Sequence, residues 1–441
     1  MRILGERKYA LWPRQHMSRV ASLLCGAALL GMLLTTRVAE PQNLARPGWA
    51  GSGMTAERWW PHAVLCEVRP GSFAANADAT SGSTLRRVAS HMEDLQTLGI
   101  DAVLLRGLES GVAQPASAQT HSVPPAAVVD LDPRYGTLDE FDQLVSEAVR
   151  HGVRVLVELH RGATGPAMIA DARFWLNRGV TGLALAGGDE AQTRALRGVL
   201  HSYIGERVLI AGGAVPSVSA SATDTDLLAR ARTSRTPRRS ETTRVVQLDQ
   251  PDLLVIRLPA VAQGAAAMRQ SLERAQALLS ARPPVPLLSA GEGSDESAST
   301  RVFATALLGS GGAVLLAADD LDLRDAASAA PSSIFAWYRQ WTGLHRGDPV
   351  MRTGTDTLLD HDAEGALVWV RRSSAGGATV VAICNLTNQP LHLSLVEDIA
   401  RLRLRGSFLR TIARSDNGMG AMPLRAVTLP PFGVYVGELS R

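Results

Sequence analysis

The feature that most constrains the fold of this chain is a regular alternation of short apolar strands with amphipathic helices. Continuous apolar runs are typical of strands that are buried on both faces of a parallel sheet. The expected strands are Val64–Val68, Ala102–Leu105, Val153–Glu158, Gly182–Ala186, Val208–Ala211, Leu253–Leu258, Pro286–Ser289 and Ala313–Leu316. Because a helical pattern follows each strand, eight such units predict an α/β fold of the (β/α)₈ barrel type.

One unit shows how local sequence directs this alternation. Thr137 and Glu140 have the spacing of a capping box, in which each side chain accepts a hydrogen bond from the other residue's backbone N–H. The helix that follows carries a single apolar stripe formed by Phe141, Leu144, Val145 and Ala148. Gly152 supplies the left-handed conformation that ends a helix, so the next strand begins at once.

The pattern changes after the last expected barrel helix, Ser332–Arg346. Antiparallel strands with intervening turns are expected at Ala366–Val370, Thr379–Asn385, His392–Leu395 and Pro430–Val436. The chain is therefore divided into a basic and apolar N-terminus (1–37), a linker (38–55), a barrel (56–349) and a C-terminal all-β domain (350–441). Asn385-Leu386-Thr387 is a glycosylation sequon, for which chance is the simpler explanation.

Composition excludes several classes of function. The net charge is only +3, and the run Arg232–Arg244 has no interleaved aromatic residues, so no nucleic-acid partner is expected. Of the three cysteines, Cys66 and Cys384 fall in separate expected strands, which predicts two buried free thiols. No CxxC, Walker or GxGxxG pattern is present, and neither a metal nor a cofactor is expected.

The N-terminus reads as an export signal. Five basic residues precede an apolar run of about 14 residues, nearer a signal-peptide core than the roughly 20 residues of a full membrane span. The residues around Ala39 form a poor cleavage site, so cleavage and anchoring stay open. Both alternatives place the body of the chain outside the cytoplasm: at the cell membrane with an extracytoplasmic domain, or secreted or periplasmic after cleavage.

Several segments, in order, resemble the α-amylase family of glycoside hydrolases, family 13. They are Trp59-Trp60 before the first strand, 92–105, 129–141, 174–186, 207–212 and 337–346. The resemblance covers about residues 57–440, and implies a barrel that acts on α-linked sugars.

The same resemblance shows that the catalytic positions are vacant. Retaining glycosidases need two carboxyl groups about 5–5.5 Å apart. The family's nucleophile and its preceding arginine correspond to Ala186 and Ala184, and its acid/base corresponds to Gly212. Alanine and glycine cannot ionise, attack or donate a proton. We therefore expect a barrel that keeps the fold and has lost hydrolysis.

Only about 20 residues separate Glu158 from the fourth strand, so the domain that this family usually inserts there is absent. This is similar to the amylase-like heavy chains of heteromeric amino-acid transporters, which are single-pass proteins. Those chains carry a cysteine just outside the membrane, and none occurs here between Cys25 and Cys66.

Three functional hypotheses follow. The first is a non-catalytic exported or anchored protein that acts by binding or as a partner subunit, with a membrane protein or an α-glucan as partner. The second is an active α-glycosidase with relocated carboxylates, and the third is a sugar-binding module. The fallback carboxylates at or near strand ends are Glu158, Asp189, Glu190, Glu292, Asp319 and Asp320.

Overall fold

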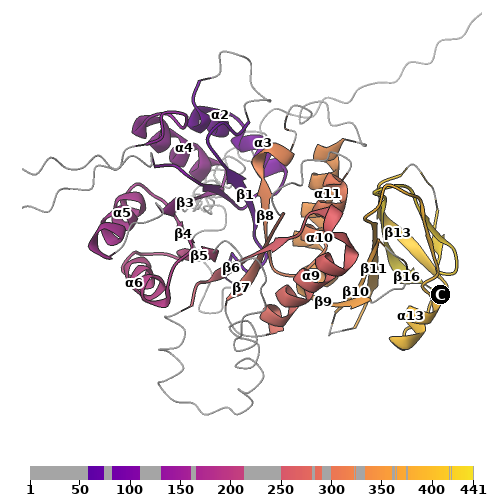
Figure 1. The fold of residues 1–441 in the computed structure, drawn as a ribbon. Coiled ribbons are helices and arrows are strands. Elements are labelled where there is room, and N and C mark those ends of the chain that lie inside the picture. The colour runs from indigo at the N-terminus through magenta and orange to yellow at the C-terminus, as the bar shows by residue number, and fades with distance from the viewer. Residues whose placement is uncertain are drawn as a thin grey trace, which may run out of the picture. The chain divides into compact units, whose positions relative to one another are not determined.

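A computed structural model shows a closed eight-stranded parallel barrel followed by antiparallel sheets (Figure 1). The structure describes residues 58–73, 82–109, 131–159, 165–212, 250–280, 284–290, 299–321, 333–359, 365–373, 376–416 and 420–440, with Leu323, Ala363 and Gly418. The barrel strands, in their order around the barrel, are β1 (Val64–Val68), β2 (Ala102–Leu105), β3 (Arg154–Leu159), β4 (Gly182–Ala186), β5 (Val208–Gly212), β6 (Leu253–Leu258), β7 (Val285–Ala290) and β8 (Ala313–Ala317).

The predicted (β/α)₈ barrel is thus confirmed. The helices and 3₁₀ turns of this part are α2 (Thr84–Ser90), α3 (Met92–Thr97), α4 (Leu138–Arg150), α5 (Gly165–Asn177), α6 (Glu190–His201), η2 (Val261–Gln263), α9 (Gly264–Ser280), α10 (Thr300–Leu308), η3 (Ala318–Asp320), α11 (Ile334–Gly347) and α12 (Pro349–Thr353). Between β3 and β4 the described element is the single helix α5, so no inserted domain fits there. The bounds of the eight barrel strands differ from those expected by at most one residue at either end.

The predicted capping box of α4 is confirmed. Thr137 Oγ1 accepts a hydrogen bond from Glu140 N at 3.3 Å, and Glu140 Oε2 accepts one from Thr137 N at 3.0 Å. Phe141 and Leu144 are fully buried. Gly152 has a φ of +69°, the left-handed conformation expected of the residue that ends the helix.

The interior of the barrel is a core of its own. Its buried side chains come from alternate positions of the strands and include Leu65, Leu104, Leu156, Ala184, Ile210, Leu253, Leu287 and Leu315. Side chains alternate between the two faces of a strand. The residue two positions beyond each of these therefore also faces the barrel axis. For every strand except β6 it lies near the C-terminal end, where barrel enzymes keep their active sites.

The C-terminal part forms a six-stranded sheet in the order β14-β13-β16-β11-β10-β9 and a two-stranded sheet of β12 and β15. Its elements are β9 (Thr355–Leu359), β10 (Ala366–Arg372), β11 (Thr379–Asn385), β12 (Leu391–Leu393), α13 (Val396–Arg401), β13 (Phe408–Arg414), β14 (Met422–Pro423), β15 (Val427–Leu429) and β16 (Val434–Ser440). The expected closing strand at Pro430–Val436 was placed too early, because Phe432 and Gly433 belong to the turn before β16. The predicted domain bounds themselves stay a prediction.

Buried polar contacts join this sheet to the barrel. Arg371 donates to Asp356 Oδ1 at 2.6 Å and to the carbonyl oxygens of Val350 and Met351 at 2.9 and 2.6 Å. Trp369 Nε1 donates to Gly309 O, at the end of α10, at 3.3 Å. Arg371 and Asp356 are almost fully buried, so the sheet is not a loosely attached module.

The predicted N-terminal segment and linker lie outside the described residues. Within the described ranges, no helix has the length and apolar character needed to cross a membrane.

Candidate functional site

The mouth of the barrel contains an ion cluster made by the first three strands. Glu67 is on β1, Arg106 directly follows β2, and Glu158 is on β3. Arg106 donates to Glu158 Oε1 from Nε at 3.1 Å and from Nη2 at 2.7 Å. It also donates from Nη1 to Glu67 Oε2 at 2.9 Å. One guanidinium group therefore lies between two carboxylates.

This cluster is largely removed from solvent. Glu67 is 7% exposed and Glu158 is 8% exposed. Burial alone would lower the pKa of Arg106, but its hydrogen bonds and charge contacts with Glu158 and Glu67 outweigh burial and raise that pKa. Arg106 is thus held as a cation, and Glu158, the first fallback carboxylate, is engaged in a buried ion pair.

Surrounding residues fix the position of the cluster. Arg69 Nε donates to the other oxygen of Glu67, Oε1, at 2.7 Å. The buried hydroxyl of Tyr135 donates to Val68 O at 2.8 Å and to Arg106 O at 2.7 Å. The Tyr135 contacts join the ends of β1 and β2. Arg106 is thus held in place at its backbone by Tyr135 and at its guanidinium by the two carboxylates.

The positions that correspond to the missing catalytic carboxylates are adjacent. Ala186 on β4 is the register partner of Gly212 on β5, and Glu158 is the register partner of Ala184. A Cβ atom added to Gly212 would lie 2.8 Å from both Cβ and Cγ2 of Val255 on β6. A side chain at residue 212 would therefore require a shift of β5 or β6.

Two other fallback carboxylates have local structural roles. Asp189 is the N-cap of α6, and its Oδ1 accepts a hydrogen bond from Gln192 N at 2.7 Å. Glu190 pairs with Arg194 one turn along the same helix at 3.3 Å, and its side chain is 68% exposed. These contacts hold neither carboxylate beside Glu158.

The carboxylates after the eighth strand face a neighbouring loop. Asp319 Oδ1 accepts a hydrogen bond from Phe73 N at 3.2 Å, and its Oδ2 accepts one from Ser72 Oγ at 3.4 Å. Phe73 has a φ of +63°, and Asp319 supports this strained turn after β1. Asp320 lies in the same 3₁₀ turn, and Glu292 is outside the described residues.

Sequence reasoning did not select Glu67 and Arg106. A signal was present, because Glu67 is the one charged residue near the end of an otherwise apolar strand and Arg106 follows another. The register of β1, β2 and β3 was needed to show that both point toward Glu158.

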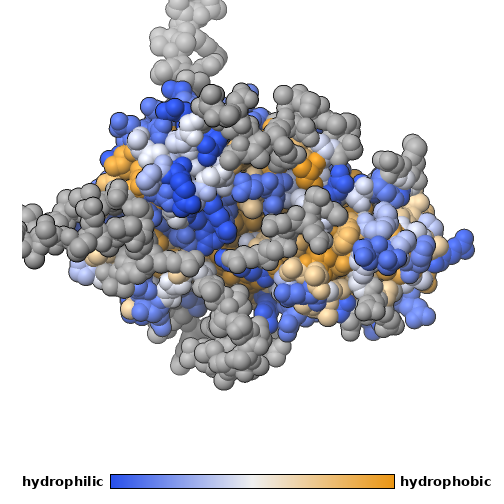
Figure 2. All heavy atoms as spheres, turned by 45° about the horizontal axis from the view of Figure 1, so that its top comes forward, coloured by the Kyte–Doolittle hydropathy of each residue, from blue (hydrophilic) through white to orange (hydrophobic). Residues whose placement is uncertain are grey.

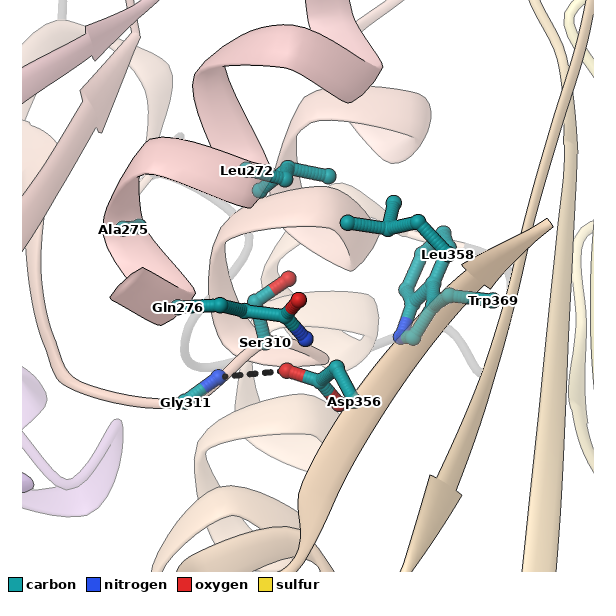
Figure 3. A pocket seen from close by; sticks show the side chains of 8 residues that line it. All are labelled: Leu272, Ala275, Gln276, Ser310, Gly311, Asp356, Leu358 and Trp369. Atoms are coloured by element: carbon teal, nitrogen blue, oxygen red, sulfur yellow. Dashed lines mark hydrogen bonds between the residues drawn. The ribbon is translucent and has the colours of Figure 1, made fainter. Parts of the chain in front are cut away.

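One cavity lies away from the mouth, between α9 and the strands β9 and β10 (Figure 3). Its enclosed volume is about 10 Å³, room for about one water molecule. It is lined by Leu272, Ala275, Gln276, Ser310, Gly311, Asp356, Leu358 and Trp369. The Gly311 N–H donates to Asp356 Oδ2 at 3.2 Å. The main polar group of the cavity, the Asp356 carboxylate, is thus already used to join the barrel to the sheet. The cavity is also smaller than typical ligand sites of about 300–1,000 Å³.

The predicted thiol state is confirmed for the two described cysteines. Cys66 and Cys384 are free and fully buried, and burial raises the pKa of each thiol well above its usual range. No group of three side chains able to hold a metal ion occurs in the described part of the chain.

No family model matches the chain. Trehalose-6-phosphate hydrolase of Escherichia coli strain K12 is 34% identical over 101 residues, 23% of this chain. A probable α-glucosidase of Rhizobium meliloti is 30% identical over 102 residues. Each match spans only 17% of the relative's length. The amino acid transporter heavy chain SLC3A2 of Oryctolagus cuniculus is 25% identical over 178 residues, which are 36% of this chain and 32% of that protein.

Solved structures extend the likeness over most of the chain. The trehalulose synthase MutB from Pseudomonas mesoacidophila MX-45 has a TM-score of 0.61 at 13% sequence identity. The isomaltulose synthase PalI from Klebsiella sp. LX3 has a TM-score of 0.61 at 12% identity. Both alignments cover 87% of this chain and all of the other. The predicted resemblance is thus confirmed at the level of fold: a barrel and β domain like those of glycoside hydrolase family 13.

Proposed function

We propose that this chain is an exported or membrane-anchored, amylase-like protein that has lost glycosidase catalysis and acts by binding, as a partner subunit. The observation that carries the proposal is the pairing of Ala186 with Gly212, where the family would have its two catalytic carboxylates. The crowding of Gly212 by Val255 adds a steric reason why a carboxylate side chain is not accommodated there.

The ion cluster supports the same proposal. A general acid must hold a proton to give away, and a nucleophile must approach the sugar. Glu158 shares the guanidinium of Arg106 with Glu67, so both carboxylates are already engaged in buried ion pairs. In the described part of the mouth, the charged groups of the cluster therefore bind each other.

The partner class is inferred by analogy. The heavy chain SLC3A2 is, by its name, a subunit of an amino acid transporter, and it shares a longer stretch with this chain than the two enzymes do. A membrane protein is therefore the proposed partner, with an α-glucan as the alternative ligand.

A second candidate is an active α-glycosidase with relocated carboxylates. One observation favours it: Glu67 and Glu158 approach opposite nitrogens of the same guanidinium, so two carboxylates do lie close together in the mouth. Displacement of Arg106 by a substrate would free this pair.

Incubation of the full chain with a panel of α-linked oligosaccharides, followed by mass spectrometry, separates the two candidates. The proposal predicts no products from protein whose circular dichroism shows a folded state. Products that disappear in both Glu67→Gln and Glu158→Gln variants would establish the second candidate and overturn the first.

A further inference from the structure

A corner of the C-terminal β domain presents a group of exposed arginines, most of which have no acidic partner. Exposed and half-buried residues alternate from Arg401 to Arg405, with Arg401, Arg403 and Arg405 exposed. The intervening Leu402 and Leu404 pack against the core of the β domain. Because the leucines anchor one side of the segment, the three arginines project from the other.

A fourth arginine lies beside this segment. Leu424 N donates to Ser407 O at 3.0 Å, which places Arg425 next to the chain that leaves Arg405. Arg425 is also exposed. We call Arg401, Arg403, Arg405 and Arg425 the arginine corner.

Three members of the corner have no acidic partner. Arg401 lies 3.9 Å from Glu397 and 3.8 Å from Asp398, the two acidic residues of α13. No ion pair or hydrogen bond of the side chains of Arg403, Arg405 or Arg425 is found among the described residues. By contrast Arg410, on the adjoining strand β13, pairs with Glu438. The corner thus keeps positive charge that the fold does not neutralise.

The backbone at Arg403 adds a second observation. Arg403 N donates to Ala400 O at 2.9 Å, and Leu404 N donates to Ile399 O at 3.1 Å. These two bonds form a Schellman motif that ends α13, and Arg403 occupies its left-handed position with a φ of +56°. Glycine is the usual residue there, so an arginine at this position is held in an unfavourable conformation.

Among the residues that the structure describes, exposed apolar side chains do not form a competing docking face. The large ones are Val149, Ile204, Leu279 and Val396, on four different parts of the chain. Figure 2 shows a mainly hydrophilic surface on the side drawn, with apolar atoms in separate groups. Val396 is 48% exposed at the start of α13, the helix that ends at Arg401.

We propose that the arginine corner binds the surface of a bilayer that contains anionic phospholipids. Guanidinium groups bind phosphate oxygens through paired hydrogen bonds, and an exposed turn suits a flat charged surface. A weak contact suffices if the predicted N-terminal segment tethers the protein to the same membrane, because a tether raises the effective concentration. The proposal is independent of whether the barrel hydrolyses sugars.

The test uses the full chain and vesicles of phosphatidylcholine with or without phosphatidylglycerol. Anionic vesicles are expected to slow backbone amide exchange at residues 396–406, and neutral vesicles are not. This local readout separates the corner from any insertion of the N-terminus. Higher salt should reduce the protection, since the contact is electrostatic.

The variant Arg403→Gly/Arg405→Ser/Arg425→Ser removes three charges, and glycine suits the backbone at residue 403. Each basic residue near an anionic surface changes partitioning onto the membrane about fivefold. We therefore expect binding of the variant to anionic vesicles to weaken on the order of a hundredfold. The matched control Arg134→Ser/Arg150→Ser/Arg194→Ser removes three exposed arginines of the barrel. It should retain the amide protection.

Three results would overturn the proposal. They are equal protection by neutral vesicles, an equal loss in the control variant, and protection of the same amides by soluble poly-glutamate but not by anionic vesicles. The last result would assign the corner to an acidic protein partner.

Discussion

Ala186 and Gly212 are register partners on β4 and β5, and no carboxylate arises from either position. Glu158 on the adjoining strand β3 is the register partner of Ala184, and it is paired with Arg106 at 2.7 Å. The part of the mouth that the structure describes is thus organised around a buried ion cluster instead of a free acid and nucleophile.

The steric state of residue 212 gives the first prediction. Gly212→Ala should destabilise the fold by about 1–3 kcal/mol, because overpacking forces neighbouring atoms to move. The contact is with Val255 Cβ at 2.8 Å, which is too close to the backbone to relax freely. Urea unfolding followed by circular dichroism measures the change.

Gly198 provides the control, since a Cβ there meets nothing within 4 Å and the residue lies in α6. Gly198→Ala should be neutral or stabilising by about 0.5–1 kcal/mol. Equal effects of the two substitutions would contradict the steric argument.

The ion cluster gives the second prediction. Arg106→Met leaves Glu67 and Glu158 as buried carboxylates without their shared cation, which should cost about 3–5 kcal/mol of unfolding free energy. Adding Glu67→Gln and Glu158→Gln to that variant should recover part of the loss, because neither buried carboxylate then carries an uncompensated charge. Thermal and urea unfolding of the set provide the measurement.

Arg150→Met is the matched control for this series. Arg150 is 71% exposed and pairs with Glu147 on the surface of α4. Its loss should change stability by no more than about 0.5 kcal/mol. A similarly small effect of Arg106→Met would show that the cluster is solvated rather than buried.

The buried His345 gives a prediction about pH. Burial lowers the pKa of His345 to about 4; the neighbouring Arg371 charge also lowers it, while the hydrogen bond to Leu308 O opposes the shift. The unfolded chain therefore binds the proton more readily than the folded one. The contribution of neutral His345 to the free energy of unfolding is fully present above pH ~6.5. It is lost as the pH falls from ~6.5 to ~4, by at most about 3 kcal/mol.

Unfolding free energies of the wild type and of His345→Asn, measured between pH 7 and pH 4, test this sign. Asparagine keeps a donor for Leu308 O but does not titrate, so its curve should fall less steeply over that window. Parallel curves would exclude His345 as the source of the pH dependence.

The sequon at Asn385 gives a further prediction. The Asn385 Nδ2 atom donates to Gln389 O at 2.7 Å and to Pro430 O at 2.8 Å, and the residue is fully buried. A glycan on this nitrogen is incompatible with both bonds. Folded protein secreted from a eukaryotic host should therefore carry no glycan at Asn385, as peptide mass spectrometry would establish; a glycosylated folded population would show that this turn opens.

Local sequence was sufficient for the barrel and insufficient for its mouth. The strand from Gly182 to Ala186 and the capping box at Thr137 follow from apolar runs and from fixed short-range spacing. The β13 strand was missed because Arg410 and Arg414 interrupt its apolar pattern on an exposed face. The Glu67–Arg106 contact depends on the register between two strands, and nothing local to either residue specifies it.

The loss of catalysis is tested most directly by a covalent trap. A retaining glycosidase forms a glycosyl-enzyme bond on its nucleophilic carboxylate, and an activated fluoroglucoside makes that intermediate accumulate. Intact-mass spectrometry of the full chain after incubation with such a reagent should show the unmodified mass. A stable glucosyl adduct that maps to Glu67 or Glu158 would contradict the proposed loss of catalysis.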